Sequence, residues 1–122
     1  MTDPRRGLGR RGEELAAAEL TQRGYVIRQR NWRCPAGEID IVAEHGGRPV
    51  FVEVRTRRGR ALGTPEVSIT PAKRERLIRV AQSYLLEAGV GEVDWRIDVV
   101  AVELTSSGRL VRIDVYENAV TG

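Results

Sequence analysis

Two carboxylates, Asp40 and Glu53, stand in strand-like apolar runs, EIDIVAE over residues 38–44 and PVFVEVRTR over residues 49–57. A Gly-Gly pair between the runs is typical of a two-residue hairpin loop. A hairpin turning on that pair opposes residues whose numbers sum to 93, which places Asp40 directly across from Glu53. Carboxylates in this relation have Cβ atoms about 4.5 to 5.5 Å apart and repel each other. A divalent cation between them, or a proton on one of them, would remove the repulsion.

The apolar pattern of the hairpin supports this register, because a shift by one residue would turn every side chain to the opposite face. The alternative is an edge hairpin whose acidic pair is solvated or neutralised by Arg55 and Arg57. The register predicts one apolar face from the pairs Ile39 with Val54, Ile41 with Val52 and Ala43 with Val50, and a second face from Val42 with Phe51, Asp40 with Glu53 and Glu38 with Arg55.

A third carboxylate, Glu13, lies in a predicted helix over residues 10–23 that ends at Gly24, a residue suited to a left-handed cap. Glu13 falls on the apolar stripe that continues to Leu20, so its side chain is predicted to face the rest of the domain. Glu14 points about 100° away from that stripe.

A second helix is predicted from Pro71 to about Ala88, with Thr70 as its N-cap and Gly89 as its stop. The only lysine of the chain, Lys73, lies in its first turn and within about 40° of the apolar arc. Lys73 is therefore predicted to project along the packed side, although an ordinary surface lysine has the same spacing.

The net charge of +3 conceals an uneven distribution. Residues 1–80 carry 17 basic and 10 acidic side chains, a net of +7, whereas residues 81–122 carry 3 and 7, a net of −4. Arginine supplies 19 of the 20 cations and forms bidentate contacts with phosphate. This charge suits a phosphate-bearing partner such as a nucleic acid, although charge runs are more often simply solvated. The candidate nucleic-acid-binding residues are Arg10, Arg11, Arg57, Arg58 and Arg60.

The remaining strand-like runs cover residues 25–32, 93–104 and 109–116. The chain therefore reads as one α/β domain over residues 1–122, in the order helix, three strands, helix, strand, with a further C-terminal strand. Residues 1–9 are predicted to be a flexible lead-in.

The sequence excludes disulfide scaffolds, structural zinc domains and membrane-spanning proteins. One cysteine, Cys34, cannot form an intrachain disulfide, and one histidine, His45, cannot build a zinc site with it. No segment approaches the roughly 18 apolar residues of a membrane span. No membrane partner is expected, and the cytoplasm is the expected compartment.

Five segments in order, GRRGEELAAAELTQRGY, GEIDIVA, FVEVRTR, the helix around Lys73 and WRIDVVAVEL, resemble the YraN family of small bacterial proteins. That family resembles archaeal Holliday-junction resolvases of the PD-(D/E)XK nuclease superfamily. The resemblance covers about residues 9–104 and implies a restriction-endonuclease-like αβββαβ core, with a mixed central sheet flanked by helices.

The resemblance also implies a catalytic site, in which Asp40, Glu53 and Glu13 bind Mg²⁺ or Mn²⁺ and Glu38 supports them. The superfamily commonly has lysine where this chain has Arg55, which stays protonated and cannot act as a general base. Arg55 would instead stabilise charge on the transferring phosphate, and Lys73 would supply the missing ammonium. The implied activity is a metal-dependent endonuclease acting on branched or structured DNA, with a homodimer by analogy to the resolvases.

Two alternatives remain open at this stage. The arginine at residue 55 also suits a nucleic-acid-binding module that kept the fold and lost turnover, with arginines 57, 58 and 60 carrying a salt-dependent affinity. The other is a protein-interaction domain whose acidic cluster is ancestral.

Overall fold

The computed structural model describes residues 4–59 and 69–120. Over these residues a five-stranded sheet has the order β1-β2-β3-β4-β5, with β3 and β4 parallel and the other neighbouring pairs antiparallel. This confirms the predicted α/β class, the αβββαβ core and the extra C-terminal strand. The elements are α1 (Pro4–Gln22), β1 (Val26–Cys34), β2 (Gly37–His45), β3 (Arg48–Arg58), α2 (Pro71–Ala88), β4 (Arg96–Leu104) and β5 (Leu110–Val120).

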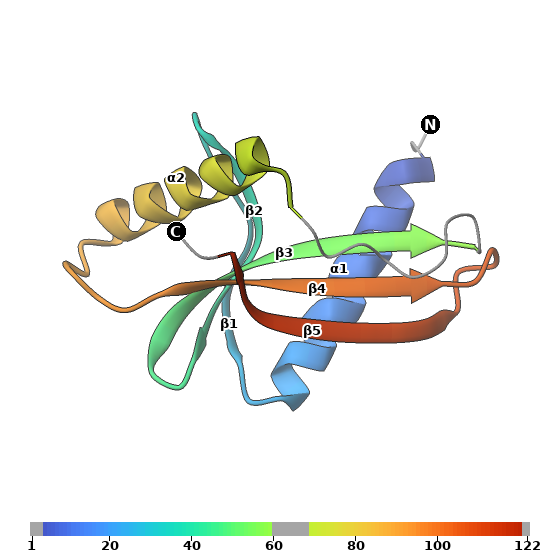
Figure 1. The fold of residues 1–122 in the computed structure, drawn as a ribbon. Coiled ribbons are helices and arrows are strands. Elements are labelled where there is room, and N and C mark those ends of the chain that lie inside the picture. Colours follow the sequence, from blue (N-terminus) through green and yellow to red (C-terminus); the bar gives the residue numbers. More distant parts are fainter. Residues whose placement is uncertain (1–3, 60–68, 121–122) are drawn as a thin grey trace.

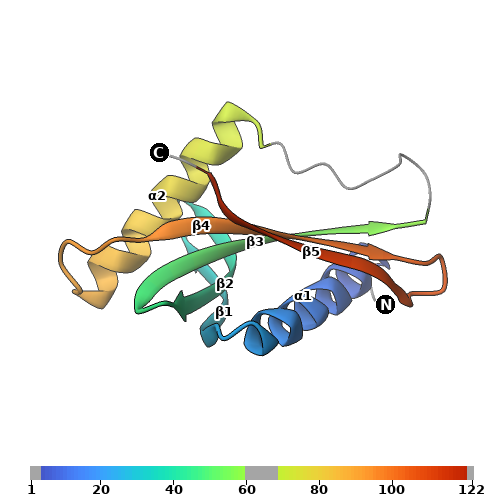
Figure 2. The ribbon, with the colours of Figure 1, turned by 60° about the horizontal axis from the view of Figure 1, so that its bottom comes forward.

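The two helices cover opposite faces of the sheet (Figures 1 and 2). Helix α1 packs on one face through Ala16 and Leu20, against strand residues that include Val52. Helix α2 packs on the other face, where its Leu77 belongs to the same buried cluster as Phe51. The sheet therefore has two buried faces, which is the usual arrangement when a sheet contains parallel strands.

Helix α1 begins at Pro4 rather than at the predicted residue 10, so residues 4–9, expected in a flexible lead-in, are helical. Proline suits a first helical turn because its φ is already helical and its missing N–H is not needed there. Gly12 then allows the helix to approach β3 closely. A Cβ atom at residue 12 would overlap the hydroxyl of Thr56 and lie 2.9 Å from Thr56 Cβ.

The predicted hairpin register is confirmed by the pairs Ile41 with Val52 and Val42 with Phe51. One predicted face is wrong, however, because Ile39 does not share a face with Ile41. Ile39 packs in the cluster on the α2 side, whereas Ile41 packs on the α1 side.

Ile39 changes face beside an irregular residue of the neighbouring strand β1, Asn31. Pairing between β1 and β2 passes from Arg30 with Ile41 to Trp32 with Ile39, across Asn31, whose φ of +55° is left-handed. A residue in the left-handed conformation interrupts the regular pleat. Side chains on either side of it then need not alternate between the two faces of the sheet. The same point of the sheet carries Asp40, whose Oδ2 accepts a 2.7 Å hydrogen bond from the Val54 N–H.

Helix α2 has the predicted bounds and caps. Thr70 Oγ1 accepts a 3.2 Å hydrogen bond from the Lys73 N–H, and Pro71 is the first helical residue. Gly89 ends the helix with φ +68°, and its N–H donates to Leu85 O at 3.1 Å. This N-terminal cap fixes the first turn of α2, and with it the position of Lys73.

The other strands occur where predicted, with different ends. Strand β1 continues to Cys34, two residues past the predicted run, and β4 begins at Arg96 rather than residue 93. Strand β5 continues past the predicted residue 116, because Val120 pairs with Ile97 of β4. The ends of a strand depend on where it pairs with its neighbours, and the local sequence pattern does not show that pairing.

Candidate metal centre and nucleic-acid interface

Three carboxylates from α1 and β2 converge at the interrupted part of the sheet. Glu13, Glu38 and Asp40 each offer an oxygen atom, and these atoms all lie within 4.8 Å of one another. They form the acidic cluster, and each side chain is partly buried. Of the three predicted metal ligands the structure brings Glu13 and Asp40 together, with Glu38 beside them.

Glu53, the other predicted ligand, makes a different contact. Its side chain is buried on β3, and its Oε1 lies 2.6 Å from Lys73 Nζ. The lysine comes from the capped first turn of α2, which places its ammonium over this part of the sheet. Lys73 therefore projects along the packed side as predicted, and Glu53 is its ion-pair partner.

The pKa of Asp40 depends on its burial and on all of these neighbouring groups. Burial raises the pKa of Asp40 to about 7, and the charge of Glu53 is the largest contribution from another carboxylate. Glu13 and Glu38 raise the Asp40 pKa further, while the hydrogen bond from the Val54 N–H lowers it. Near neutral pH this site therefore holds a proton part of the time, the state expected of crowded carboxylates without a cation.

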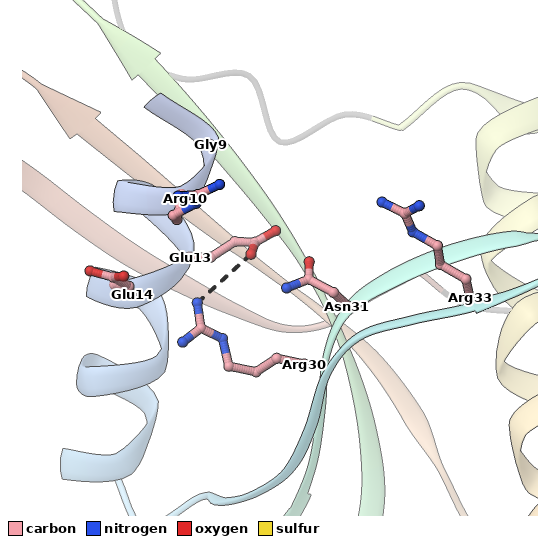
Figure 3. Close-up of a pocket in the computed structure, with 7 residues that line it drawn as sticks. All are labelled: Gly9, Arg10, Glu13, Glu14, Arg30, Asn31 and Arg33. Carbon is pink, nitrogen blue, oxygen red and sulfur yellow. Dashed lines mark ion pairs between the residues drawn. The ribbon is translucent and has the colours of Figure 1, made fainter. Parts of the chain in front are cut away.

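Asn31 is a site residue that the sequence analysis missed. With its amide nitrogen turned toward Glu13, Asn31 donates to both carboxylate oxygens at 3.1 Å. Figure 3 shows the Asn31 side chain projecting from β1 beside Glu13. Asparagine tolerates the left-handed conformation better than most residues, which suits it to a strand interruption next to a functional group. The only sequence signal is an Asn within an otherwise strand-like run.

Arginines of β1 surround the acidic cluster. Arg30 Nη2 lies 3.8 Å from Glu13 Oε2, and Arg33 Nε donates to Glu38 Oε2. Both lie in a pocket of about 730 Å³ between α1 and β1, drawn in Figure 3. The sequence analysis did not select either residue, because the alternation of a strand does not reveal which neighbouring helix its side chains face.

The predicted nucleic-acid-binding arginines occupy several places. Arg10 lines the same pocket as Glu13, whereas Arg11 Nε donates to Gly108 O at 2.8 Å, in the turn between β4 and β5. Arg57 and Arg58 lie at the end of β3, where Arg58 is exposed. The half-buried Arg55 lies earlier on that strand. Arg60 lies outside the described residues.

A second polar cluster, also unanticipated, is buried near the start of β4. Asp98 is fully buried and accepts hydrogen bonds from Tyr25 Oη at 2.7 Å and Arg96 Nε at 2.9 Å. The Asn118 N–H donates to Asp98 at 2.8 Å, and the His45 ring stacks on Tyr25 with centroids 4.0 Å apart. Burial, together with Asp98, raises the pKa of Tyr25 well above its ordinary value. The polar atoms are satisfied within the cluster, as a structural role requires.

Together these features define a small α/β domain in which carboxylates of the first helix and second strand meet beside an arginine-lined pocket. The chain belongs to the family described as "Uncharacterised protein family UPF0102", whose model matches residues 12–102. This is the YraN family, so the resemblance predicted from the sequence is confirmed.

Relatives match this chain over nearly its whole length. A UPF0102 protein of Roseiflexus castenholzii is 50% identical over 121 residues, which cover 98% of each chain. A UPF0102 protein of Moorella thermoacetica is 48% identical over 119 residues, covering 98% of this chain and 99% of its own. No helix in residues 4–59 and 69–120 is long and apolar enough to cross a membrane.

Proposed function

We propose that this protein is a metal-dependent endonuclease that hydrolyses phosphodiester bonds in branched or structured DNA. The observation that carries the proposal is the convergence of Glu13, Glu38 and Asp40 within 4.8 Å, beside the Glu53–Lys73 pair. The resemblance of the family to Holliday-junction resolvases supports the same chemistry and suggests the substrate class. The basic excess of residues 1–80 is suited to a phosphate-rich partner.

The residues at the site fit a hard divalent cation. All the converging donors are carboxylate oxygens, which favour Mg²⁺ or Mn²⁺ over softer metals. Glu13, Glu38 and Asp40 would hold the ion, with Glu53 as the further carboxylate on the opposite strand. A bound ion of this kind would orient a phosphate and lower the pKa of a bound water. The mutual repulsion that raises the Asp40 pKa is the repulsion that a cation relieves.

The cationic side chains would act on the phosphate. Arg55 stays protonated, so it is suited to stabilise negative charge on the transferring phosphate and not to accept a proton from water. Lys73 supplies an ammonium held in place by Glu53 and the helix cap. Water activation would then depend on the carboxylates and the ion.

Asn31 is expected to tune the affinity for the ion. Asn31→Gly keeps the left-handed backbone accessible but removes the amide that orients Glu13. We expect about tenfold weaker Mn²⁺ binding, the lower end of the effect of losing a group that orients a ligand. Calorimetric titration measures this change, with urea unfolding to show that the variant is folded. Unchanged Mn²⁺ affinity in the folded variant would remove Asn31 from the site.

A second candidate is a nucleic-acid-binding module without turnover. Cations of the chain already oppose the carboxylates, since Arg30 lies near Glu13, Arg33 pairs with Glu38 and Lys73 pairs with Glu53. Such a balance of charge would also stabilise a site that holds no ion. Affinity would then come from Arg57 and Arg58 at the end of β3 and from Arg60, and neutralising them should flatten the dependence of binding on salt.

Calorimetric titration of Mn²⁺ into the metal-free protein separates the two candidates. We expect the wild type to bind Mn²⁺, Asp40→Ala to lose binding, and Glu44→Gln to keep it. Glu44 is a matched control because it lies on the same strand and pairs with the exposed Arg28, away from the cluster. Cleavage of a four-way DNA junction is then expected for the wild type and the control, and not for Asp40→Ala.

Absence of both Mn²⁺ binding and cleavage in the wild type would favour the binding module. Equal cleavage by wild type and Asp40→Ala would overturn the proposed site.

A further inference from the structure

The pocket between α1 and β1 joins the acidic cluster to a group of arginines. Its volume is about 730 Å³, and Glu13 of the cluster forms part of its wall (Figure 3). Three of its seven lining residues are arginines, Arg10 on α1 and Arg30 and Arg33 on β1. A concave surface that presents several guanidinium groups is complementary to phosphate, which arginine binds in a bidentate manner.

Two of these arginines contact the carboxylates that are candidate metal ligands. Arg30 lies 3.8 Å from Glu13, and Arg33 donates to Glu38. The Arg33 side chain is 79% exposed and that of Arg30 is 36% exposed. The Arg33–Glu38 pair is exposed, and the Arg30–Glu13 pair is long at 3.8 Å although Glu13 is only 16% exposed, so both contribute little to stability and a competing cation can replace them at small cost.

We propose that Arg30 and Arg33 form a phosphate-binding site that becomes available when a divalent cation occupies the acidic cluster. The cation takes over the oxygens of Glu13 and Glu38, and the two guanidinium groups then bind a backbone phosphate of the nucleic acid in the pocket. This inference rests on the proposed function for the metal and goes beyond it, because it assigns a phosphate site and couples it to the ion.

The coupling has a thermodynamic signature that an ordinary surface arginine lacks. If the metal releases two phosphate-binding groups, metal must raise the affinity for nucleic acid, and nucleic acid must raise the affinity for metal by the same factor. Arg30 and Arg33 should therefore contribute to DNA binding with metal and contribute little without it. A surface arginine outside the cluster contributes equally under both conditions.

The test compares DNA affinity with and without a cation that fills an oxygen site. A fluorescently labelled four-way DNA junction is titrated with protein in EDTA or in Ca²⁺, at matched ionic strength, and anisotropy is measured. Ca²⁺ prefers carboxylate oxygens as Mg²⁺ does. The proteins are the wild type, the double variant Arg30→Gln/Arg33→Gln, and Arg28→Gln as the control. Arg28 is a matched arginine on β1 that pairs with the exposed Glu44.

We expect Ca²⁺ to tighten DNA binding by wild type and Arg28→Gln about tenfold, and by the double variant at most about twofold. In EDTA the wild type and the double variant should agree within about twofold, because the two arginines are then held by carboxylates. The inference is overturned if the double variant loses DNA affinity by the same factor in EDTA and in Ca²⁺. It is also overturned if Ca²⁺ tightens DNA binding by the double variant as much as by the wild type.

Failure of this inference is distinguishable from failure of the proposed function. Calorimetry of Mn²⁺ with wild type and Asp40→Ala tests the metal site alone. Metal binding that depends on Asp40, together with DNA binding that is indifferent to Ca²⁺, would reject the coupling and leave the metal site in place.

Discussion

Asp40→Asn is expected to stabilise the metal-free protein at pH 8 and to remove most of the loss of stability that the wild type shows between pH 5 and pH 8. The reason is the raised pKa of Asp40, about 7 in the folded protein against an ordinary value of 3.8. An asparagine has no proton to lose in this range. Its carbonyl can still accept from Val54, and its amide can donate to a neighbouring carboxylate.

The sign of this effect follows from proton binding. Between pH 4 and pH 7 the folded state keeps a proton on Asp40 that the unfolded state releases, so the free energy of unfolding falls as pH rises. The fall is complete once pH exceeds the folded pKa. A shift of about three pKa units corresponds to about 4 kcal/mol, which is a large fraction of the stability of a small domain.

Urea unfolding in EDTA at pH 5, 6, 7 and 8 measures the effect. Glu44→Gln is the control, because the exposed Glu44 pairs with Arg28, which lowers its pKa, so Glu44 stays ionised across this range. All three proteins keep the single histidine, and differences among them therefore report the substituted carboxylates. An equal pH dependence in wild type and Asp40→Asn would show that Asp40 is ionised throughout.

Elements with strong local signals were predictable from the sequence. The Gly46-Gly47 loop set the hairpin register, and the apolar pattern on both strands agreed with it. Helix α2 was predictable because Thr70, Pro71 and Gly89 mark its ends chemically. These signals lie within a few residues of the structure that they specify, so no knowledge of the tertiary fold is needed.

The features of the site that were missed depend on contacts between distant segments. Asn31 has a left-handed φ, for which an Asn within a strand-like run is only a weak signal, and Ile39 packs on the α2 side although alternation places it with Ile41. The contacts of Arg30 with Glu13 and of Lys73 with Glu53 each join a helix to a strand. Periodicity predicts which face a side chain occupies, but the partner on that face is a property of the assembled fold.

The cations that oppose the carboxylates explain how the acidic site is tolerated without metal. Arg30, Arg33 and Lys73 come from two elements and approach the carboxylates from different sides. Each reduces the repulsion among groups that would otherwise favour separation of α1 from the sheet. The acidic cluster, Glu53 and these three cations therefore form one electrostatic unit, in which an added ion must compete with the protein's own side chains.

Asp98→Ala is expected to destabilise the protein by about 3 to 5 kcal/mol, because it removes the buried carboxylate that pairs with Arg96 and leaves Arg96 with the exposed Glu117 at 3.9 Å. Asp98 is fully buried, and the Arg96 side chain is only 12% exposed. Tyr25 Oη and the Asn118 N–H would lose their acceptor as well. Urea unfolding at pH 7 measures the change.

Strand β5 supplies a matched control for this prediction. Arg112 and Asp114 have the same spacing as Arg96 and Asp98 and form a 2.6 Å ion pair, but their side chains are 54% and 30% exposed. Asp114→Ala should therefore cost less than about 1 kcal/mol, as solvent-exposed ion pairs do. Equal costs for the two substitutions would mean that burial is not the source of the effect.

The double variant Arg96→Met/Asp98→Ala separates loss of the ion pair from exposure of an unpaired charge. If the cost of Asp98→Ala comes mainly from the Arg96 guanidinium left without Asp98, replacing Arg96 by methionine as well should recover part of the stability. A double variant less stable than Asp98→Ala would instead show that Arg96 stabilises the fold without Asp98. Its other contacts include hydrogen bonds to His45 Nδ1 at 2.7 Å and Tyr25 Oη at 3.1 Å, the Glu117 carboxylate at 3.9 Å, and the Tyr25 ring at 5.7 Å from its guanidinium carbon.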